Sequence, residues 1–152
     1  MPKGLYIEKS VEIARSKSEV YNYLKYCRNQ DQFSVWNMAD PEKKTNYTGT
    51  DGEVGFVYSW DSTNKNVGAG SQEIKKMNPD ERIEYELRFE RPMKNVGVSV
   101  FTLAEAGSGT KVTWNFSGPT KFPMSLFKGM FQKMLGKDIA KSLDNLKTVL
   151  EK

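Results

Sequence analysis

The strongest constraint on the fold of this chain is a series of short segments in which apolar and polar residues alternate. Clusters of Gly, Asn, Asp and Pro separate these segments, which is typical of an antiparallel meander. The alternation is clearest in three apolar sets: Phe56, Tyr58 and Trp60; Ile83, Tyr85, Leu87 and Phe89; and Val112, Trp114 and Phe116. Because successive side chains of a β-strand point to opposite faces, each set lines one face of a sheet. The pattern predicts a sheet with one strongly aromatic face.

Six or seven strands are expected along the chain. The first covers about residues 5–14, and those after Pro41 cover about residues 44–50, 54–60, 69–76, 82–90, 96–104 and 110–117. Ser16 followed by Glu19 has the form of a capping box, which predicts a short helix over about residues 17–27. Residues 29–40 predict a further helical turn and a loop anchored by aromatic side chains.

A long amphipathic helix is expected over residues 123–150. Pro123 suits the first turn of a helix, and no proline follows it. The apolar residues recur at helical intervals, bulky at first and aliphatic later: Leu126, Phe127, Met130, Phe131 and Met134, then Ile139, Leu143, Leu146 and Leu150. The aliphatic half is expected to pack on the sheet. The Met- and Phe-rich half suits either the mouth of an irregular apolar cavity or an ordinary core.

Length and composition predict a single globular domain over residues 1–152. The net charge of +4 is modest and does not indicate a nucleic-acid partner. The one cysteine, Cys27, excludes an intramolecular disulfide and favours a reducing compartment, so a cytoplasmic location is expected. No run approaches the ~18 apolar residues of a membrane span, so neither a signal peptide nor stable membrane insertion is expected.

The chain contains no histidine. This excludes Ser-His and Cys-His nucleophiles, and it removes the commonest metal ligand and the commonest acid-base group near neutral pH. Gly68 and Gly70 lie within a strand pattern instead of opening a helix, so a phosphate-binding loop is not indicated either. No metal or other cofactor is expected.

Several local strings, in this order and spacing, resemble one protein superfamily. They are VEI at residues 11–13, SEVYNYL at 18–24, YSWD at 58–61, VGAGSQEI at 67–74, RIEYEL at 82–87, GTKVTW at 109–114, GKD at 136–138 and LDNLK at 143–147. Together with the order of elements, they resemble the polyketide cyclase/dehydrase-like branch of the START-like (SRPBCC) superfamily over residues 7–152. The resemblance implies an α+β helix-grip fold: a curved antiparallel sheet of six to seven strands wrapped around a long C-terminal helix, with two short helices after the first strand. It also implies a cavity between sheet and helix.

The aromatic residues of the predicted inner face either fill a core or line such a cavity. Tyrosine and tryptophan carry polar tips that need partners when buried, and taken together the set favours a cavity. The predicted ligand-binding residues are Trp36, Met38, Phe56, Tyr58, Trp60, Gln72, Tyr85, Leu87, Phe89, Phe101, Trp114, Phe116, Phe127, Met130, Phe131 and Met134. Residues 36–38 serve either as a lid or as a hydrophobic anchor for their loop.

Gln72 shares a strand face with Gly70 and Ile74, so parity points its amide inward. A buried amide needs a partner, which is either a neighbouring tyrosine or a ligand carbonyl or hydroxyl group. Gly68 and Gly70 mark either a bulge or a close approach to the backbone.

Three function classes remain open at this stage. The first is binding or transport of a small hydrophobic molecule of lipid, sterol or aromatic polyketide type, by a monomer or a homodimer. The second is a cyclase- or dehydrase-like enzyme that works by positioning its substrate, with Tyr58, Tyr85 or Asp61 as proton carriers. The third is a protein-interaction module, as in chaperone-activating relatives of the fold. The fold alone does not choose among them.

Overall fold

The sheet is the frame of the molecule. A computed structural model describes residues 4–64, 67–91, 94–119 and 128–152, with the side chains of residues 119 and 128–132 outside the description. Within these residues the strands are β1 (Gly4–Ile13), β2 (Lys44–Thr48), β3 (Val57–Asp61), β4 (Ala69–Asn78), β5 (Arg82–Arg91), β6 (Asn95–Ala106) and β7 (Gly109–Pro119). They form one curved antiparallel sheet in the order β1-β7-β6-β5-β4-β3-β2. The expected fold class is confirmed.

The strand register brings the inward residues into rows that cross the sheet. One row joins Tyr58, Gln72 and Leu87 on β3, β4 and β5. A second row joins Trp60, Gly70 and Phe89 on the same strands. The alternation seen in single segments therefore becomes a continuous inner face.

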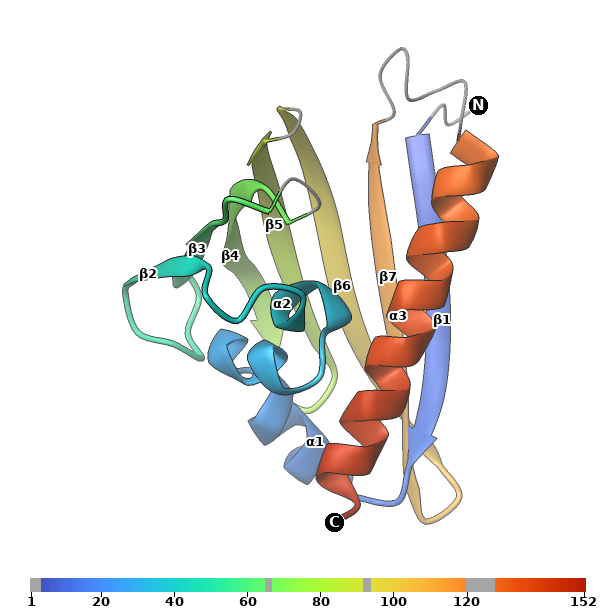
Figure 1. Cartoon of the computed structure of the whole chain (residues 1–152). Coiled ribbons are helices and arrows are strands. Elements are labelled where there is room, and N and C mark those ends of the chain that lie inside the picture. The colour runs from blue at the N-terminus through green and yellow to red at the C-terminus, as the bar shows by residue number, and fades with distance from the viewer. Residues whose placement is uncertain (1–3, 65–66, 92–93, 120–127) are drawn as a thin grey trace.

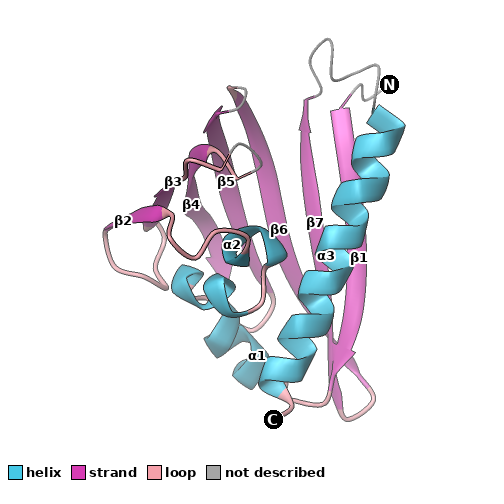
Figure 2. Ribbon diagram, viewed as in Figure 1, coloured by secondary structure: helices cyan, strands magenta, loops and turns pink. Residues whose placement is uncertain are grey.

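The helices lie on one side of this sheet (Figure 2). They are α1 (Lys17–Leu24), the 3₁₀ helix η1 (Cys27–Gln32), α2 (Val35–Met38) and α3 (Lys128–Leu150). The α3 helix runs along β1, and α1, η1 and α2 cover the neighbouring part of the inner face (Figure 1). None of the helices in the described ranges is long and apolar enough to cross a membrane.

The first helix begins as expected and ends early. The backbone N–H of Glu19 donates to Ser16 Oγ (3.2 Å), which caps the helix. The expected continuation to Cys27 is wrong because the Asp51 carboxylate accepts hydrogen bonds from the backbone N–H groups of Cys27 (2.7 Å) and Arg28 (3.2 Å). This long-range contact starts a separate helical turn, and no local pattern predicts it.

One strand boundary differs from the sequence expectation by three residues, and one helix boundary is not tested by the described residues. The third strand begins at Val57 and not at Val54, because Gly55 adopts φ of 96° and interrupts the extended backbone. The C-terminal helix is described from Lys128, so the expected start at Pro123 and residues 124–127 lie outside the described residues.

The core lies between the inner sheet face and the helices. Ile139, Leu143 and Leu146 on α3 are fully buried, which confirms the expectation that the aliphatic half of the helix packs on the sheet. Val20 and Leu24 extend the same cluster beneath α1. This packing closes the end of the fold that holds the C-terminal half of α3 and leaves the other end for the cavity.

Candidate ligand-binding cavity

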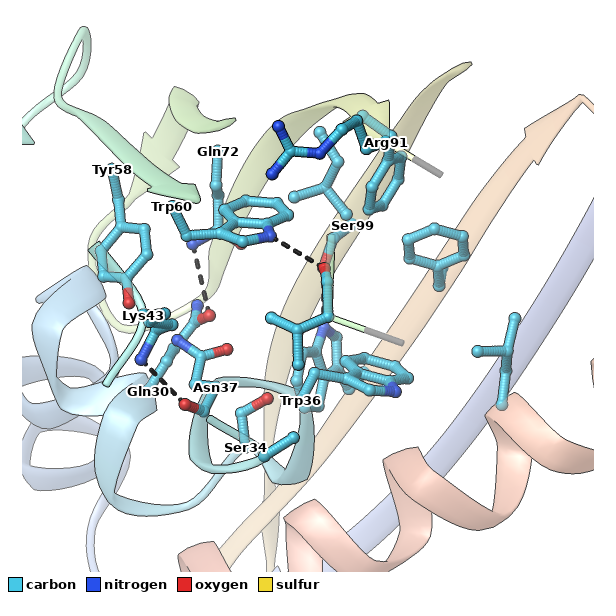
Figure 3. A pocket seen from close by; sticks show the side chains of 17 residues that line it. Gln30, Ser34, Trp36, Asn37, Lys43, Tyr58, Trp60, Gln72, Arg91 and Ser99 are labelled. Atoms are coloured by element: carbon cyan, nitrogen blue, oxygen red, sulfur yellow. Dashed lines mark hydrogen bonds between the residues drawn. The ribbon is translucent and has the colours of Figure 1, made fainter. Parts of the chain in front are cut away.

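A cavity of about 270 Å³ lies between the inner sheet face, the η1–α2 segment and α3. Figure 3 shows it from close by. Its lining residues come from η1, α2 and the loop that follows, from β3 to β7 and from α3: Gln30, Ser34, Trp36, Asn37, Ala39, Lys43, Tyr58, Trp60, Val67, Gln72, Leu87, Phe89, Arg91, Ser99, Trp114, Phe116 and Leu135. Most of these side chains are apolar or aromatic, as in sites that take apolar molecules.

Three side chains of α3 hold the η1–α2 segment in place over the sheet. The Asn145 amide donates to the Phe33 carbonyl (3.1 Å), and Ser142 Oγ accepts from the Val35 N–H (3.0 Å). The Trp36 indole N–H donates to Asp138 Oδ2 (3.0 Å). These contacts fix one wall of the cavity against the helix, and Trp36 lies within that wall.

All three tryptophans of the chain line the cavity. Trp36 and Trp114 meet edge to face, with ring centroids 5.9 Å apart. Each indole N–H has a protein acceptor: Asp138 Oδ2 for Trp36 (3.0 Å), the Val67 carbonyl for Trp60 (3.2 Å) and Ser99 Oγ for Trp114 (2.7 Å). With their polar tips satisfied, the rings present only apolar surface to the cavity.

A group of uncharged polar side chains forms the part of the wall shared by η1, α2 and β4. Gln72 points inward, as its strand parity predicts, and its Nε2 donates to Gln30 Oε1 (3.3 Å; Figure 3). Its partner is therefore a glutamine that the sequence analysis did not consider. Among the described residues, the buried Ser34 Oγ has no hydrogen-bond partner, and Gln30 Nε2 makes no bond of ordinary geometry, although the Gln30 amide lies beside the buried Tyr85 hydroxyl.

A compact charged network stands beside this group. Asp31 Oδ1 accepts from the Tyr58 hydroxyl (3.0 Å) and the Asn37 amide (3.1 Å), and Lys43 Nζ lies 3.5 Å away. Lys43 also donates to the Asn37 carbonyl (2.9 Å), and its side chain is only 8% exposed. The Asp31 carboxylate therefore compensates the positive charge of the buried Lys43 side chain. Burial and the Asp31 carboxylate raise the pKa of the Tyr58 phenol far above its ordinary value of 10.0.

The structure divides the sequence-predicted ligand-binding residues that it describes into three groups, and three further residues lie outside the description. Eight of them line the cavity: Trp36, Tyr58, Trp60, Gln72, Leu87, Phe89, Trp114 and Phe116. Three are packed in the core and do not line it: Phe56, Tyr85 and Phe101. Met38 and Met134 are exposed, and Phe127 with the side chains of Met130 and Phe131 lies outside the described residues.

The core placements have clear physical causes. Phe101 stacks on Trp114 with ring centroids 4.6 Å apart, so the tryptophan covers it. Phe56 stacks on Tyr47 (6.1 Å), away from the cavity. Tyr85 is fully buried below Gln30, and its hydroxyl is directed at the Leu24 carbonyl (3.5 Å). Burial raises the pKa of Tyr85 well above 10.0, and the nearby Gln30 amide opposes that shift.

The three residues that the sequence analysis considered as proton carriers do not lie together in one site. Of Tyr58, Tyr85 and Asp61, only Tyr58 lines the cavity. Asp61 is 59% exposed and is ion-paired with Arg91 at the rim. Arg88 alternates along β5 with the inward-facing Leu87 and Phe89, and it lies with Glu73 (3.0 Å) and Glu86 on the other face of the sheet.

Several residues that line the cavity were not predicted from the sequence, and most of them are polar. Ser99 shares its strand face with Phe101, so parity could have identified it. Leu135 precedes Ile139 by one helical turn and could have been placed on the same helix face. Gln30 and Ser34 lie in a segment without a regular period, and no local signal marks them.

A curved antiparallel sheet that encloses a cavity together with a C-terminal helix defines a helix-grip protein of the START-like (SRPBCC) class. The chain belongs to the family described as "Polyketide cyclase / dehydrase and lipid transport", whose profile matches residues 5–151. The resemblance inferred from the sequence is therefore confirmed.

Three solved structures illustrate how far the fold is shared. Protein CV1439 from Chromobacterium violaceum is 16% identical with a TM-score of 0.68, over 97% of each chain. The Aha1 dimer from Colwellia psychrerythraea is 16% identical with a TM-score of 0.67, over 97% of this chain and 96% of that one. DynU16, from the dynemicin biosynthetic locus, is 16% identical with a TM-score of 0.68, over 96% of this chain and 47% of that one. A search of curated proteins found no match.

Proposed function

We propose that this protein binds a small, mostly apolar molecule in the cavity between its sheet and α3, as a carrier or a sensor. The observation that supports this function is the cavity itself, whose wall contains all three tryptophans with their N–H groups already satisfied. An ordinary core is packed to nearly crystalline density with few voids, so an apolar space of this size needs an occupant. The family description, which includes lipid transport, agrees with this role.

The volume limits the size of the ligand. A cavity of about 270 Å³ lies just below the range of about 300–1,000 Å³ that is typical of sites for small molecules. A one- or two-ring molecule of on the order of ten non-hydrogen atoms fits the space that the described residues enclose. At about −0.5 kcal/mol per non-hydrogen atom, such a ligand binds with a Kd on the order of 0.1 mM.

The three tryptophans provide a direct assay. In a ¹H–¹⁵N correlation spectrum of labelled protein, the three indole N–H signals all report on the cavity wall. Titration with 1-methyltetralin, an apolar bicycle of suitable size, is expected to shift these signals saturably. If they stay in place up to the solubility limit of this probe and of related one- and two-ring molecules, the proposed function is wrong.

A matched pair of variants locates the binding. Leu87 lines the cavity, and Leu87→Phe fills part of it, so binding is expected to weaken about tenfold. Val98 on β6 is an exposed residue outside the cavity, and Val98→Phe is expected to leave binding unchanged. Equal weakening by both variants would place the probe elsewhere on the protein.

A further inference from the structure

The charged residues that line the cavity are all cationic. Among the described residues of the lining they are Lys43 and Arg91, and no aspartate or glutamate belongs to that part of the lining. The carboxylates that pair with these two cations, Asp31 and Asp61, lie outside the lining. A cavity wall whose charged groups are of one sign favours a ligand of the opposite sign.

Arg91 lies at the mouth of the cavity. It is the last residue of β5, and it shares the inward face of that strand with Leu87 and Phe89 because residues two apart point to the same side. Figure 3 shows its side chain extending over the edge of the pocket on the same side as Trp60. The Arg91 side chain is 55% exposed, whereas that of Lys43 is 8% exposed. Arg91 is therefore the cation that a ligand reaches most easily.

The Arg91 guanidinium has N–H groups that the protein does not use. Its Nη2 donates to the Asp61 carboxylate and to the Ser62 carbonyl (3.1 Å), and its Nη1 and Nε have no partner among the described residues. Asp61 is itself 59% exposed, and an ion pair between exposed groups contributes little to stability. A ligand carboxylate can therefore bind the free N–H groups in the forked geometry that arginine favours, or replace Asp61 at little cost.

We propose that the ligand is an apolar carboxylic acid whose carboxylate binds the Arg91 guanidinium at the cavity mouth, while its apolar body lies against Trp60, Phe89 and Phe116. This inference rests on the proposed function and adds the charge of the ligand and its orientation. The three aromatic rings contact one another in series and form a continuous apolar surface next to Arg91. At the mouth the carboxylate stays partly hydrated, so its binding avoids the full cost of burying a charge.

Three probes with one bicyclic skeleton test the inference: tetralin-1-carboxylate, its neutral analogue tetralin-1-carboxamide, and 1-methyltetralin. Their affinities are measured at neutral pH and low salt from the tryptophan indole N–H signals. The wild type is expected to bind the carboxylate about three- to tenfold more tightly than the carboxamide, the effect of one partly exposed, charge-assisted contact. Added salt is expected to reduce this preference, because salt screens exposed charges.

Two substitutions are expected to change the preference in opposite directions. Arg91→Gln removes the cation and is expected to abolish the preference for the carboxylate over the carboxamide. Asp61→Asn frees Arg91 from its carboxylate partner and is expected to raise the preference about two- to threefold. The matched control is Arg82→Gln, which alters another exposed arginine of β5 that is paired with Glu84 (2.8 Å) and lies outside the cavity lining. This control is expected to leave the preference unchanged.

Binding of 1-methyltetralin shows that each variant is folded and retains the cavity. If the wild type binds the carboxylate no more tightly than the carboxamide, the inference is refuted while the apolar cavity stands. If the preference survives Arg91→Gln, the carboxylate lies elsewhere and the assignment of Arg91 is overturned. An equal loss of preference in Arg82→Gln would attribute the effect to the overall charge of the protein and would overturn the assignment as well. If no probe moves the indole signals, the proposed function fails together with the inference.

Discussion

The Ser34 hydroxyl gives the sharpest test of how the cavity affects stability. Ser34→Ala removes a single buried oxygen that has no hydrogen-bond partner among the described residues. An unsatisfied buried hydroxyl group costs about 1–3 kcal/mol. Loss of a few van der Waals contacts, at ~0.1–0.2 kcal/mol each, offsets about 0.5 kcal/mol of the gain. The unliganded variant is therefore expected to be about 1 kcal/mol more stable, with a Tm about 2–4 °C higher.

Ser142→Ala is the matched control. It removes the same hydroxyl group from a buried serine whose Oγ makes two hydrogen bonds. Ser142 Oγ accepts from the Val35 N–H (3.0 Å) and donates to the Asp138 carbonyl (2.8 Å). Its removal is expected to cost about 1–3 kcal/mol. Urea unfolding and thermal unfolding followed by circular dichroism give both values, and an unchanged m-value shows that the comparison is valid. If Ser34→Ala is destabilised as much as Ser142→Ala, the Ser34 hydroxyl already has a partner, and the reasoning from an unpaired atom is refuted.

Two further predictions concern the backbone of β4 and the response to alkali. Gly70→Ala is expected to lower the free energy of unfolding by about 2–4 kcal/mol, because its Cβ would lie 2.5 Å from the Arg88 carbonyl oxygen and 2.9 Å from the Trp60 ring; a urea midpoint equal to that of the wild type would contradict the close approach. Burial, with a smaller contribution from Asp51, raises the pKa of the Cys27 thiol from 9.0 to about 12, so the folded protein keeps a proton that the unfolded chain releases. The contribution of the thiol to stability is expected to be constant below about pH 8.5 and to fall above it by up to about 1.4 kcal/mol per pH unit. Cys27→Ala should flatten this decline between pH 8 and 10 in urea unfolding, and parallel curves for the two proteins would show that the thiol does not titrate as stated.

The success of the fold prediction and the partial match between the predicted ligand-binding residues and the cavity lining have the same physical origin. Strand parity depends only on position along the chain, so it correctly placed Tyr58, Gln72, Leu87 and Trp114 on one face. Parity does not state what covers that face. Tyr85 shares its strand face with Leu87, yet it is fully buried below Gln30 while Leu87 lines the cavity.

The residues that were missed or misplaced depend on contacts between distant segments. The end of α1 is set by Asp51, and the position of η1 and α2 is set by Asp138, Ser142 and Asn145 on α3. These partners are separated by between 24 and 112 residues in the chain. Met134 was expected to face the cavity, but the orientation of α3 leaves its side chain exposed.

The amino-acid sequence alone determined the class of fold and which side chains share a face, because the periods of strands and helices are local and are written in the order of apolar residues. It also excluded histidine-based chemistry. Only the tertiary structure decided where space remains beside those faces and which buried polar atoms lack partners. Both depend on the curvature of the sheet and on how closely the η1–α2 segment approaches it, and these quantities are the sum of many long-range contacts.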